Sequence, residues 1–517
     1  MEKSYADFMN EISADELYER LLAYGLFTDK LPPIFSSVDF YNYCQNKKAT
    51  FSNKCKQYVY YENMRNINVP RSLAIPNPMA YQKLCRCLSD NWNNLRQHLE
   101  KQTSGQNYRI SRIHIRKIKD SKALFNMNYD NWKTDGSPVP DLLIGKKYVV
   151  KTDISNCFPS IYTHSISWAL VGKEDSKKNK QNEDEWYNKI DLYTRNCKDG
   201  ETHGLLIGPH ASNLLSELIL TVVDKNMCEK HRDDGGLSYI RNIDDYTCYV
   251  DSVEKGQLFL TELGEELRKF DLSLNFKKTN IQKLPLASEE EWVRKIKSIY
   301  LLEKNGMLDY LGVRSYLDSA IDLMIQNKED SSILNYAIKV LSRRELTQNA
   351  RQYYIKTIFH LSLLYPYLIR LLEEYVFKPL RVECEQIQSF SNRAFNLGIS
   401  TKNYEAICFS IYFSLKYNFE IYGLDADDAI SNDSCLFKLF AYLYFDNHQN
   451  ETEKKKLKNH ARDLAKIDDD FERNWLFTYE ALSQTDLKGD WKPMKKQGVS
   501  SYDKAKGNNN LLGFSFL

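Results

Sequence analysis

The sequence has little charge imbalance and no long apolar run. Its 517 residues contain 71 Lys and Arg against 69 Asp and Glu, a formal net charge of +2, which excludes a uniformly basic coat for nucleic acid. No run approaches the eighteen apolar residues of a transmembrane helix, so we expect no membrane span and no membrane partner. The N-terminal segment mixes acidic residues through its first turns and has no apolar signal core. We therefore expect a cytoplasmic protein.

Paired cysteines are also missing. The eleven cysteines are scattered, and the nearest two, Cys85 and Cys87, are separated by one residue. This pattern indicates reduced thiols and excludes a disulfide framework or a zinc ribbon.

The hydrophobic fraction of 42% and the aromatic fraction of 13% exclude a disordered chain. The length allows two or three domains with sizeable cores.

The first part of the chain is expected to be mainly helical. The first seventy residues and the stretch from Met79 to about Leu99 have helical patterns, separated by a breaker at residues 75–78. Residues 109–119 alternate isoleucine with polar or basic residues, which predicts a strand with one basic face. Arg112 and Arg116 on that face are candidates for contact with a triphosphate or a nucleic acid. The alternative is an ordinary solvated strand face.

The middle of the chain has β patterns separated by helices. We expect a strand over residues 148–154, a buried helix over 213–223, a hairpin over 239–250, a helix over 258–270 and a strand over 272–276. This order of elements predicts an antiparallel or mixed sheet with helices on one face.

Strand patterns fade after residue 316. Helical segments follow at roughly one pair per forty residues, on the order of the period of helical-repeat proteins. Because the sequence shows no residue-level repetition, an irregular helical bundle fits equally well. Residues 486–517 are expected to form a flexible tail, with an apolar tip at residues 511–517 that could dock elsewhere.

Three acids occupy the ends of the predicted central strands. Asp153 ends the first strand, and Asp244 and Asp245 occupy the tip of the hairpin. Each alone is more often a turn or cap residue. Neighbouring strands would bring them together, and clustered carboxylates repel unless cations neutralise them. Two Mg²⁺ ions, or Mn²⁺, held by such a cluster would support nucleotidyl transfer.

Four segments resemble reverse transcriptase motifs in the correct order. Residues 153–161 resemble motif A, residues 204–212 resemble motif B, residues 242–245 resemble motif C, and residues 275–279 resemble motif D. Residues 161–170 and 207–210 narrow the resemblance to the defence-associated, abortive-infection reverse transcriptases of bacteria. The resemblance implies an α+β fold with fingers and palm, followed by an all-α, HEAT-like helical-repeat domain. The implied regions are residues 1–145 (N-terminal region and fingers), 146–315 (palm), 316–485 (helical repeats in place of a thumb) and 486–517 (tail).

The same resemblance implies roles for individual residues. Asp153, Asp244, Asp245 and the Ile154 carbonyl would hold the metal ions. Phe158 would block a ribose 2′-hydroxyl and so favour deoxynucleotides, although it could also be plain core. Lys278 would lie near the leaving pyrophosphate, unless it is simply a solvated lysine. Gly208 would let the backbone approach nucleotide and template.

Two positions depart from the usual pattern. Ile207 replaces the glutamine of retroviral-type enzymes, and Asn242 replaces the aromatic residue that often opens motif C. Both departures argue against processive copying of a template. They leave the acid cluster intact.

The expected function is therefore that of a nucleotidyltransferase in antiphage defence, an RNA-directed or template-independent DNA polymerase. Its partners would be dNTPs, a nucleic acid product, a non-coding RNA and further copies of the chain in a trimer or hexamer. Tyr502 is a minor candidate for a priming hydroxyl. The alternatives are a non-catalytic RNA-binding scaffold and an RNA-synthesising polymerase.

Overall fold

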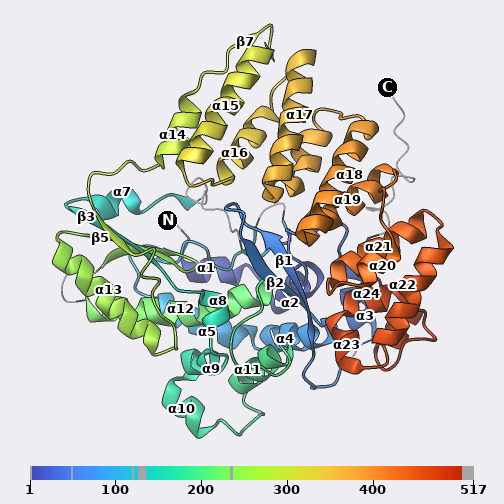
Figure 1. The fold of residues 1–517 in the computed structure, drawn as a ribbon. Coiled ribbons are helices and arrows are strands. Elements are labelled where there is room, and N and C mark those ends of the chain that lie inside the picture. Colours follow the sequence, from blue (N-terminus) through green and yellow to red (C-terminus); the bar gives the residue numbers. More distant parts are fainter. Residues whose placement is uncertain (1–2, 48–49, 119–120, 126–134, 233–236, 504–517) are drawn as a thin grey trace.

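The computed structural model describes residues 3–47, 50–118, 121–125, 135–232 and 237–503 (Figure 1). A small antiparallel hairpin lies at the centre, a four-stranded sheet lies to one side, and a curved band of helices passes around the hairpin (Figure 1). The sheet belongs to the middle of the sequence, and the helical band is formed by its C-terminal part.

The N-terminal region combines helices with the central hairpin. Its helices are α1 (Tyr5–Asn10), α2 (Ala14–Tyr24), α3 (Val38–Lys47), α4 (Pro78–Asp90), α5 (Trp92–Thr103) and α7 (Val139–Leu143). Asn77 caps α4 through Met79 N, with Pro78 in the first turn, so the predicted breaker marks the start of this helix. The predicted helix from Met79 to Leu99 is two helices, α4 and α5, which meet at Asn91.

The hairpin corrects the expectation that the first seventy residues are helical. Strands β1 (Tyr58–Met64) and β2 (Pro70–Pro76) pair in antiparallel register, with Tyr58 opposite Pro76 and Met64 opposite Pro70. In β1, buried and more exposed residues alternate, which is the period-two pattern of a strand with one covered face. β1 packs against helices α19, α21, α23 and α24 of the C-terminal region, so tertiary packing covers that face.

Residues 109–116 are also different from the prediction. They form only isolated bridges, with Ser111 beside Arg241 and Ile115 beside Phe125, and all eight residues are buried. The expected strand with one basic face is therefore wrong, and so is the alternative of a solvated strand face.

The central sheet confirms the predicted antiparallel arrangement. Its strand order is β4-β5-β3-β6, where the strands are β3 (Tyr148–Asp153), β4 (Ser238–Asn242), β5 (Asp245–Val250) and β6 (Asn280–Lys283). The strand expected over residues 272–276 is absent from this described segment, where only Leu274 bridges to Ile154. The fourth strand instead lies a few residues later.

Six helices accompany this sheet: α8 (Cys157–Ser160), α9 (His164–Val171), α10 (Lys173–Lys178), α11 (Trp186–Asn196), α12 (His210–Lys230) and α13 (Val253–Arg268). Helix α13 packs on β3 and β5, where a Cβ on Gly256 would lie 3.1 Å from side-chain atoms of Val150 and Ile281. Helix α12 is buried along most of its length, as its dense apolar sequence predicts.

The C-terminal part is helical apart from a short hairpin of β7 (Glu303–Lys304) and β8 (Met307–Leu308), which follows its first helix. Its α-helices are α14 (Glu291–Ser298), α15 (Tyr310–Gln326), α16 (Ser332–Leu341), α17 (Gln348–Leu364), α18 (Cys384–Thr401), α19 (Tyr404–Tyr417), α20 (Ala426–Ile430), α21 (Cys435–Asn447), α22 (Glu451–Leu464), α23 (Asp468–Arg473), α24 (Trp475–Ala481) and α25 (Trp491–Lys496). A 3₁₀ turn, η2 (Pro366–Leu371), and a π turn, η3 (Glu373–Phe377), lie between α17 and α18.

Residues 486–503 are folded and do not form the expected flexible tail. Trp491 of α25 is buried and stacks on Trp475, with ring centroids 5.9 Å apart. Tyr502 bridges to Phe35 of the N-terminal region, and burial raises its pKa, so its hydroxyl lies within a structured contact. The apolar tip at residues 511–517 lies outside the described residues.

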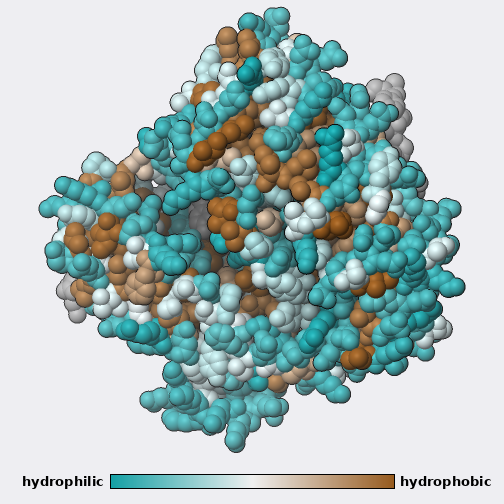
Figure 2. Space-filling model, viewed as in Figure 1, coloured by the Kyte–Doolittle hydropathy of each residue, from teal (hydrophilic) through white to brown (hydrophobic). Residues whose placement is uncertain are grey.

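The surface is mixed in character. Apolar side chains gather on the upper helices α15–α17, whereas the outer helix α22 is mainly hydrophilic (Figure 2). Within the described parts of the chain, no helix has both the length and the apolar character needed to cross a membrane.

Candidate active site

The three acids meet at one end of two paired strands. Asp153 is the last residue of β3 and lies directly opposite Asp245, the first residue of β5. Ile154 donates a backbone hydrogen bond to the carbonyl of Asp244, with an N···O distance of 3.2 Å. The fold therefore brings together two segments that lie far apart in the sequence, as the strand patterns predict.

Asp244 lies in a strained two-residue turn. Asn242 of β4 pairs with Asp245 of β5, so Ile243 and Asp244 form the tip and Asp245 already belongs to the strand. Ile243 has a φ of +59°, a left-handed conformation that β-branched residues rarely adopt and that costs about 1–3 kcal/mol. The surrounding structure must therefore hold this turn in place.

Arg241 supplies that support from inside the protein. Its side chain is fully buried, and its Nη1 donates to the carbonyl oxygen of Ile243 at 2.8 Å. The same guanidinium bonds Glu217 Oε2 at 2.9 Å and Asp224 Oδ2 at 2.7 Å. Glu217 also accepts a hydrogen bond from Tyr5 of α1 at 3.0 Å. A buried cation thus connects the catalytic turn to helix α12 and the N-terminal region.

The sequence analysis missed these residues, although a signal was present. Glu217 and Asp224 are seven positions apart in the apolar helix α12, which places both acids on one face. Two acids on one face of a buried helix require a buried cation, and Arg241 is that cation.

The pKa of Asp244 is raised by its surroundings. Burial raises the pKa of Asp244 to about 6, with further contributions from the charges of Asp245 and Asp153, while Lys278 opposes the rise. Asp153 is 5% exposed, and its Oδ1 atom has no hydrogen-bond partner among the described residues.

Lys278 lies directly on this cluster. Asn275 donates to the backbone carbonyl of Asp153 at 2.8 Å, which docks the loop after Leu274 onto the end of β3. The loop carries Lys278 Nζ to 2.5 Å from Asp153 Oδ2. Lys278 therefore provides positive charge where three carboxylates converge.

The donor set fits a divalent cation. The described residues contain no ready-made group of three or more His, Cys, Asp or Glu in metal-binding geometry. However, the oxygen-only set of Asp153, Asp244 and Asp245 is what Mg²⁺ prefers, and the unpartnered Asp153 Oδ1 is available as a ligand. Ile154, whose carbonyl is the fourth predicted ligand, follows Asp153 and is buried.

Phe158 lies beside the catalytic turn. It belongs to the short helix α8, and with Ile243 and Asn213 it lines a small cavity beneath the turn. Its neighbour Cys157 is buried, and burial followed by the charge of Asp244 raises the pKa of that thiol to about 12. The ring is partly buried against the core, so it is held in position close to the acids.

Gly208 is required by a close backbone contact. Its φ is +131°, and a Cβ at this position would lie 3.0 Å from the carbonyl oxygen of Ala74 in β2. The preceding Ile207 accepts a backbone hydrogen bond from Ala74 at 2.9 Å. The predicted motif B loop is thus fixed against the central hairpin.

The structure places Arg112 and Arg116 away from solvent. Arg112 Nη2 donates to the carbonyl of Gly136 at 2.7 Å, and Arg116 pairs with Asp135. Both arginines are buried, so the expected contact with a triphosphate conflicts with their surroundings. The alternating pattern was misleading because burial covers both faces of this segment.

Arg71 is a better-placed cation that the sequence analysis missed. It lies on β2, and its pKa is lowered by burial and by Arg65, whereas the charge of Asp244 opposes this change. Arg71 is therefore within electrostatic reach of the acid cluster. Because residues 58–76 were expected to be partly helical, this placement was not foreseen.

Comparison with known proteins gives one family match. Residues 81–315 match the family described as reverse transcriptase (RNA-dependent DNA polymerase), a segment that contains all three acids, Phe158, Gly208 and Lys278. No curated protein matches the chain.

Two solved structures show a distant likeness. Telomerase from Candida albicans in complex with a TWJ fragment of telomeric RNA is 12% identical, with a TM-score of 0.29, over 69% of this chain and 64% of that one. Apo telomerase from Candida tropicalis is 9% identical, with a TM-score of 0.32, over 85% of this chain and 77% of that one. This chain therefore spans slightly less than two thirds of the first of these structures. The match of residues 81–315 to the reverse transcriptase family is the more informative similarity.

Proposed function

We propose that this protein is a DNA polymerase that joins deoxynucleotides by two-metal nucleotidyl transfer, because residues 81–315 match the reverse transcriptase family. The observation that carries the proposal is the convergence of Asp153, Asp244 and Asp245 at the ends of β3 and β5, with the pKa of Asp244 raised to about 6. A site without a cationic ligand has no physical reason to keep three acids so close.

Each surrounding residue has a defined part in this proposal. Asp153, Asp244, Asp245 and the Ile154 carbonyl hold Mg²⁺ or Mn²⁺, which when bound activates the attacking hydroxyl and stabilises the leaving pyrophosphate. Arg241 is a positioning residue that holds the Ile243–Asp244 turn through its bond to the Ile243 carbonyl. Gly208 keeps the motif B loop against β2.

Three further residues act on the nucleotide. Lys278, which pairs with Asp153 in this structure, would neutralise or protonate the leaving pyrophosphate. Arg71 attracts the nucleotide phosphates from the hairpin side. Phe158 excludes the ribose 2′-hydroxyl and so selects dNTPs.

The proposal also covers the helical C-terminal region and the biological role of the protein. Residues 316–485 act as a HEAT-like repeat domain in place of a thumb, supported by the consecutive packing of α18 on α19 and of α19 on α21. The motif strings at residues 161–170 and 207–210 support membership of the bacterial abortive-infection group and a role in defence against bacteriophage. Synthesis is either protein-primed and untemplated or templated by a bound non-coding RNA, in a homotrimer or homohexamer.

The test is incorporation of each labelled dNTP and rNTP by the purified protein with Mg²⁺. The double variant with Asp244→Ala and Asp245→Ala should lose incorporation, while Asp251→Asn, which changes a partly exposed acid just after β5, should retain it. Nuclease and protease treatment of the product then separate RNA templating from protein priming. RNA binding with no incorporation by the wild-type protein would favour the non-catalytic scaffold, and incorporation of rNTPs alone would favour an RNA polymerase.

A further inference from the structure

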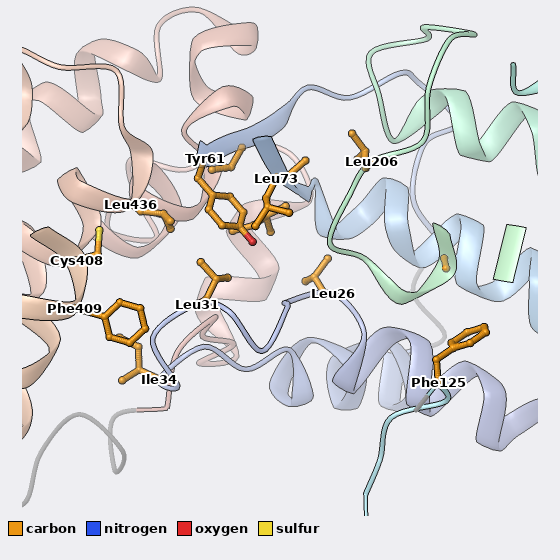
Figure 3. Close-up of a cluster of buried hydrophobic side chains, with 14 of the residues drawn as sticks. Leu26, Leu31, Ile34, Tyr61, Leu73, Phe125, Leu206, Cys408, Phe409 and Leu436 are labelled. Carbon is orange, nitrogen blue, oxygen red and sulfur yellow. The ribbon is translucent and has the colours of Figure 1, made fainter. Parts of the chain in front are cut away.

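A cavity with largely apolar walls lies between the central hairpin and the C-terminal helices. Its volume is about 190 Å³, and it is lined by the loop at residues 30–32, strand β1, and helices α19 and α21. Figure 3 shows part of the wall, with Cys408, Phe409 and Leu436 on one side of Tyr61. All four of these residues are buried. Since an apolar cavity of about 150 Å³ can hold a benzene ring, this one has room for a phenylalanine side chain.

The exposed edge of the cavity is acidic. Among the described residues that line it, three are acids, Glu62, Glu405 and Asp433, and one is a cation, Lys30. Burial lowers the pKa of Lys30 and raises the pKa of Glu405 to about 7, and the charge of each opposes the shift of the other. These two charges offset each other, whereas Glu62 and Asp433 are exposed and leave a surplus of negative charge. An occupant that carries positive charge next to an apolar part complements this arrangement.

Two wall residues have a buried polar atom with no hydrogen-bond partner in the described chain. They are the hydroxyl of Tyr61, which is 6% exposed, and Oδ1 of Asn63, which is 5% exposed. The Nδ2 group of Asn63 already donates to Glu405 at 2.7 Å, so its oxygen needs an N–H donor from elsewhere. A peptide occupant supplies backbone N–H groups and carbonyls for both atoms, which a purely apolar molecule does not.

The last described residues of the chain lie beside this cavity. Asp503 donates a backbone hydrogen bond to the carbonyl of Ile34 at 2.8 Å, and Ile34 in turn donates to the carbonyl of Pro32 at 2.8 Å. Pro32 lines the cavity. Phe35, the residue after Ile34, contacts Phe440 of α21 with ring centroids 5.8 Å apart. The C-terminal segment is therefore anchored next to two of the elements that form the wall.

Residues 504–517 lie outside the described residues, and their sequence complements the cavity. Lys504 and Lys506 come first, and an apolar tip, residues 511–517, follows. The seven residues between Asp503 and that tip reach at most about 25 Å when fully extended. Because the anchor is hydrogen-bonded to the loop that forms one wall, this length is sufficient to bring the tip to the cavity.

We propose that residues 511–517 of the same chain dock in this cavity, with one phenylalanine side chain inside it and with Lys504 and Lys506 near Glu62 and Asp433. The docking is intramolecular, since a short linker gives the anchored tip an effective concentration in the millimolar range. A docked tip joins β1 to α19 and α21, and so strengthens the contact between the central hairpin and the helical region. The proposal does not depend on polymerase activity.

Disulfide trapping in the full chain tests the contact directly. Cys408, a free cysteine of the cavity wall, is the native partner, and Gly513→Cys and Ser515→Cys place a thiol in the tip while keeping both phenylalanines. After oxidation with diamide, at least one variant should form a disulfide with Cys408 within one chain, identified by mass spectrometry of its peptides. The same variants with Cys408→Ala are the control, and the exposed Cys384 reports random collisions.

A peptide titration measures the same contact without introduced cysteines. A fluorescent peptide of residues 504–517 is titrated into the wild-type chain and into the full-length double variant with Phe514→Ser and Phe516→Ser. Because the wild-type tip competes for the cavity, the peptide should bind the double variant about 10-fold more tightly, or more. Adding Asp433→Asn to the double variant should weaken binding about 3-fold and reduce its dependence on salt. Adding Asp322→Asn, which changes an exposed acid of α15, is the matched control and should leave binding unchanged.

The results separate the chain's own tip from other occupants. A disulfide from Ser515→Cys that joins two chains, seen as a dimer on a non-reducing gel, would assign the cavity to the tip of a second copy and overturn intramolecular docking. Trapping of Cys384 as readily as Cys408, or no disulfide with Cys408 in either variant, would overturn the site. Equal binding of the peptide by the wild type and the double variant would also overturn it.

Discussion

Replacing Asp244 by asparagine should stabilise the metal-free protein while abolishing its chemistry. The pKa of Asp244 rises from 3.8 to about 6, mainly through burial and then through the charges of Asp245 and Asp153. At about 1.4 kcal/mol per pKa unit, ionised Asp244 destabilises the fold by about 3 kcal/mol. Partial exposure to solvent reduces the expected gain in Asp244→Asn to about 1–2 kcal/mol at pH 7.5.

The sign of the pH dependence follows from the direction of this change. A carboxyl group with a raised pKa binds its proton more tightly in the folded state than in the unfolded state. The destabilisation is therefore absent below about pH 4 and complete above about pH 6. The advantage of Asp244→Asn should shrink by about half between pH 7.5 and pH 5.

Urea denaturation in EDTA at these two pH values measures the effect. Asp251→Asn is the control, because the pKa of Asp251 is lowered by Lys255 and Lys146, so its loss should not stabilise the protein. Added Mg²⁺ should stabilise the wild type and leave Asp244→Asn nearly unchanged. A variant no more stable than the wild type at pH 7.5, or an advantage that does not change with pH, would refute the reasoning.

Four further substitutions test other parts of the site. Arg241→Met leaves Glu217 and Asp224 without their buried cation and should lower the free energy of unfolding by about 3–5 kcal/mol in urea denaturation, and a loss below ~1 kcal/mol would contradict its role. Lys278→Met removes the cation on Asp153, so Mn²⁺ titration should show tighter metal binding while turnover falls, and weaker binding would count against the assignment. Phe158→Ala should raise rNTP incorporation relative to dNTP incorporation, and unchanged discrimination would remove its gating role. Gly208→Ala should lower stability by about 1–3 kcal/mol through its φ of +131° and the nearby Ala74 carbonyl, and wild-type stability would contradict this contact.

The sequence predicts the catalytic end of the sheet well. The strand that ends at Asp153 and the hairpin that carries Asp244 are short runs rich in β-favouring residues, and local patterns of this kind survive in the fold. The antiparallel order follows from them. In this sheet the fourth strand was predicted at residues 272–276 but lies at residues 280–283. It is a short edge strand whose exposed, polar sequence has no clear strand pattern.

The wrong and missed predictions have a common physical origin, which is that they depend on contacts between distant parts of the chain. β1 alternates like a strand, but its helical neighbours in sequence obscured this pattern, and its covering helices come from residues more than three hundred positions away. Arg112 and Arg116 are basic residues that the fold buries, with Asp135 as the partner of Arg116, and a sequence pattern cannot show such a pairing. Arg71 and Arg241 acquire their roles only through tertiary contacts.

The most direct test of the central claim is single-turnover incorporation of one labelled dNTP at increasing Mg²⁺ concentrations. The wild type and Asp251→Asn should both incorporate the nucleotide, with a saturable dependence on Mg²⁺, while Asp244→Asn should show none at any concentration. Incorporation by Asp244→Asn at the wild-type rate would contradict the assignment of Asp153, Asp244 and Asp245 as the polymerase site.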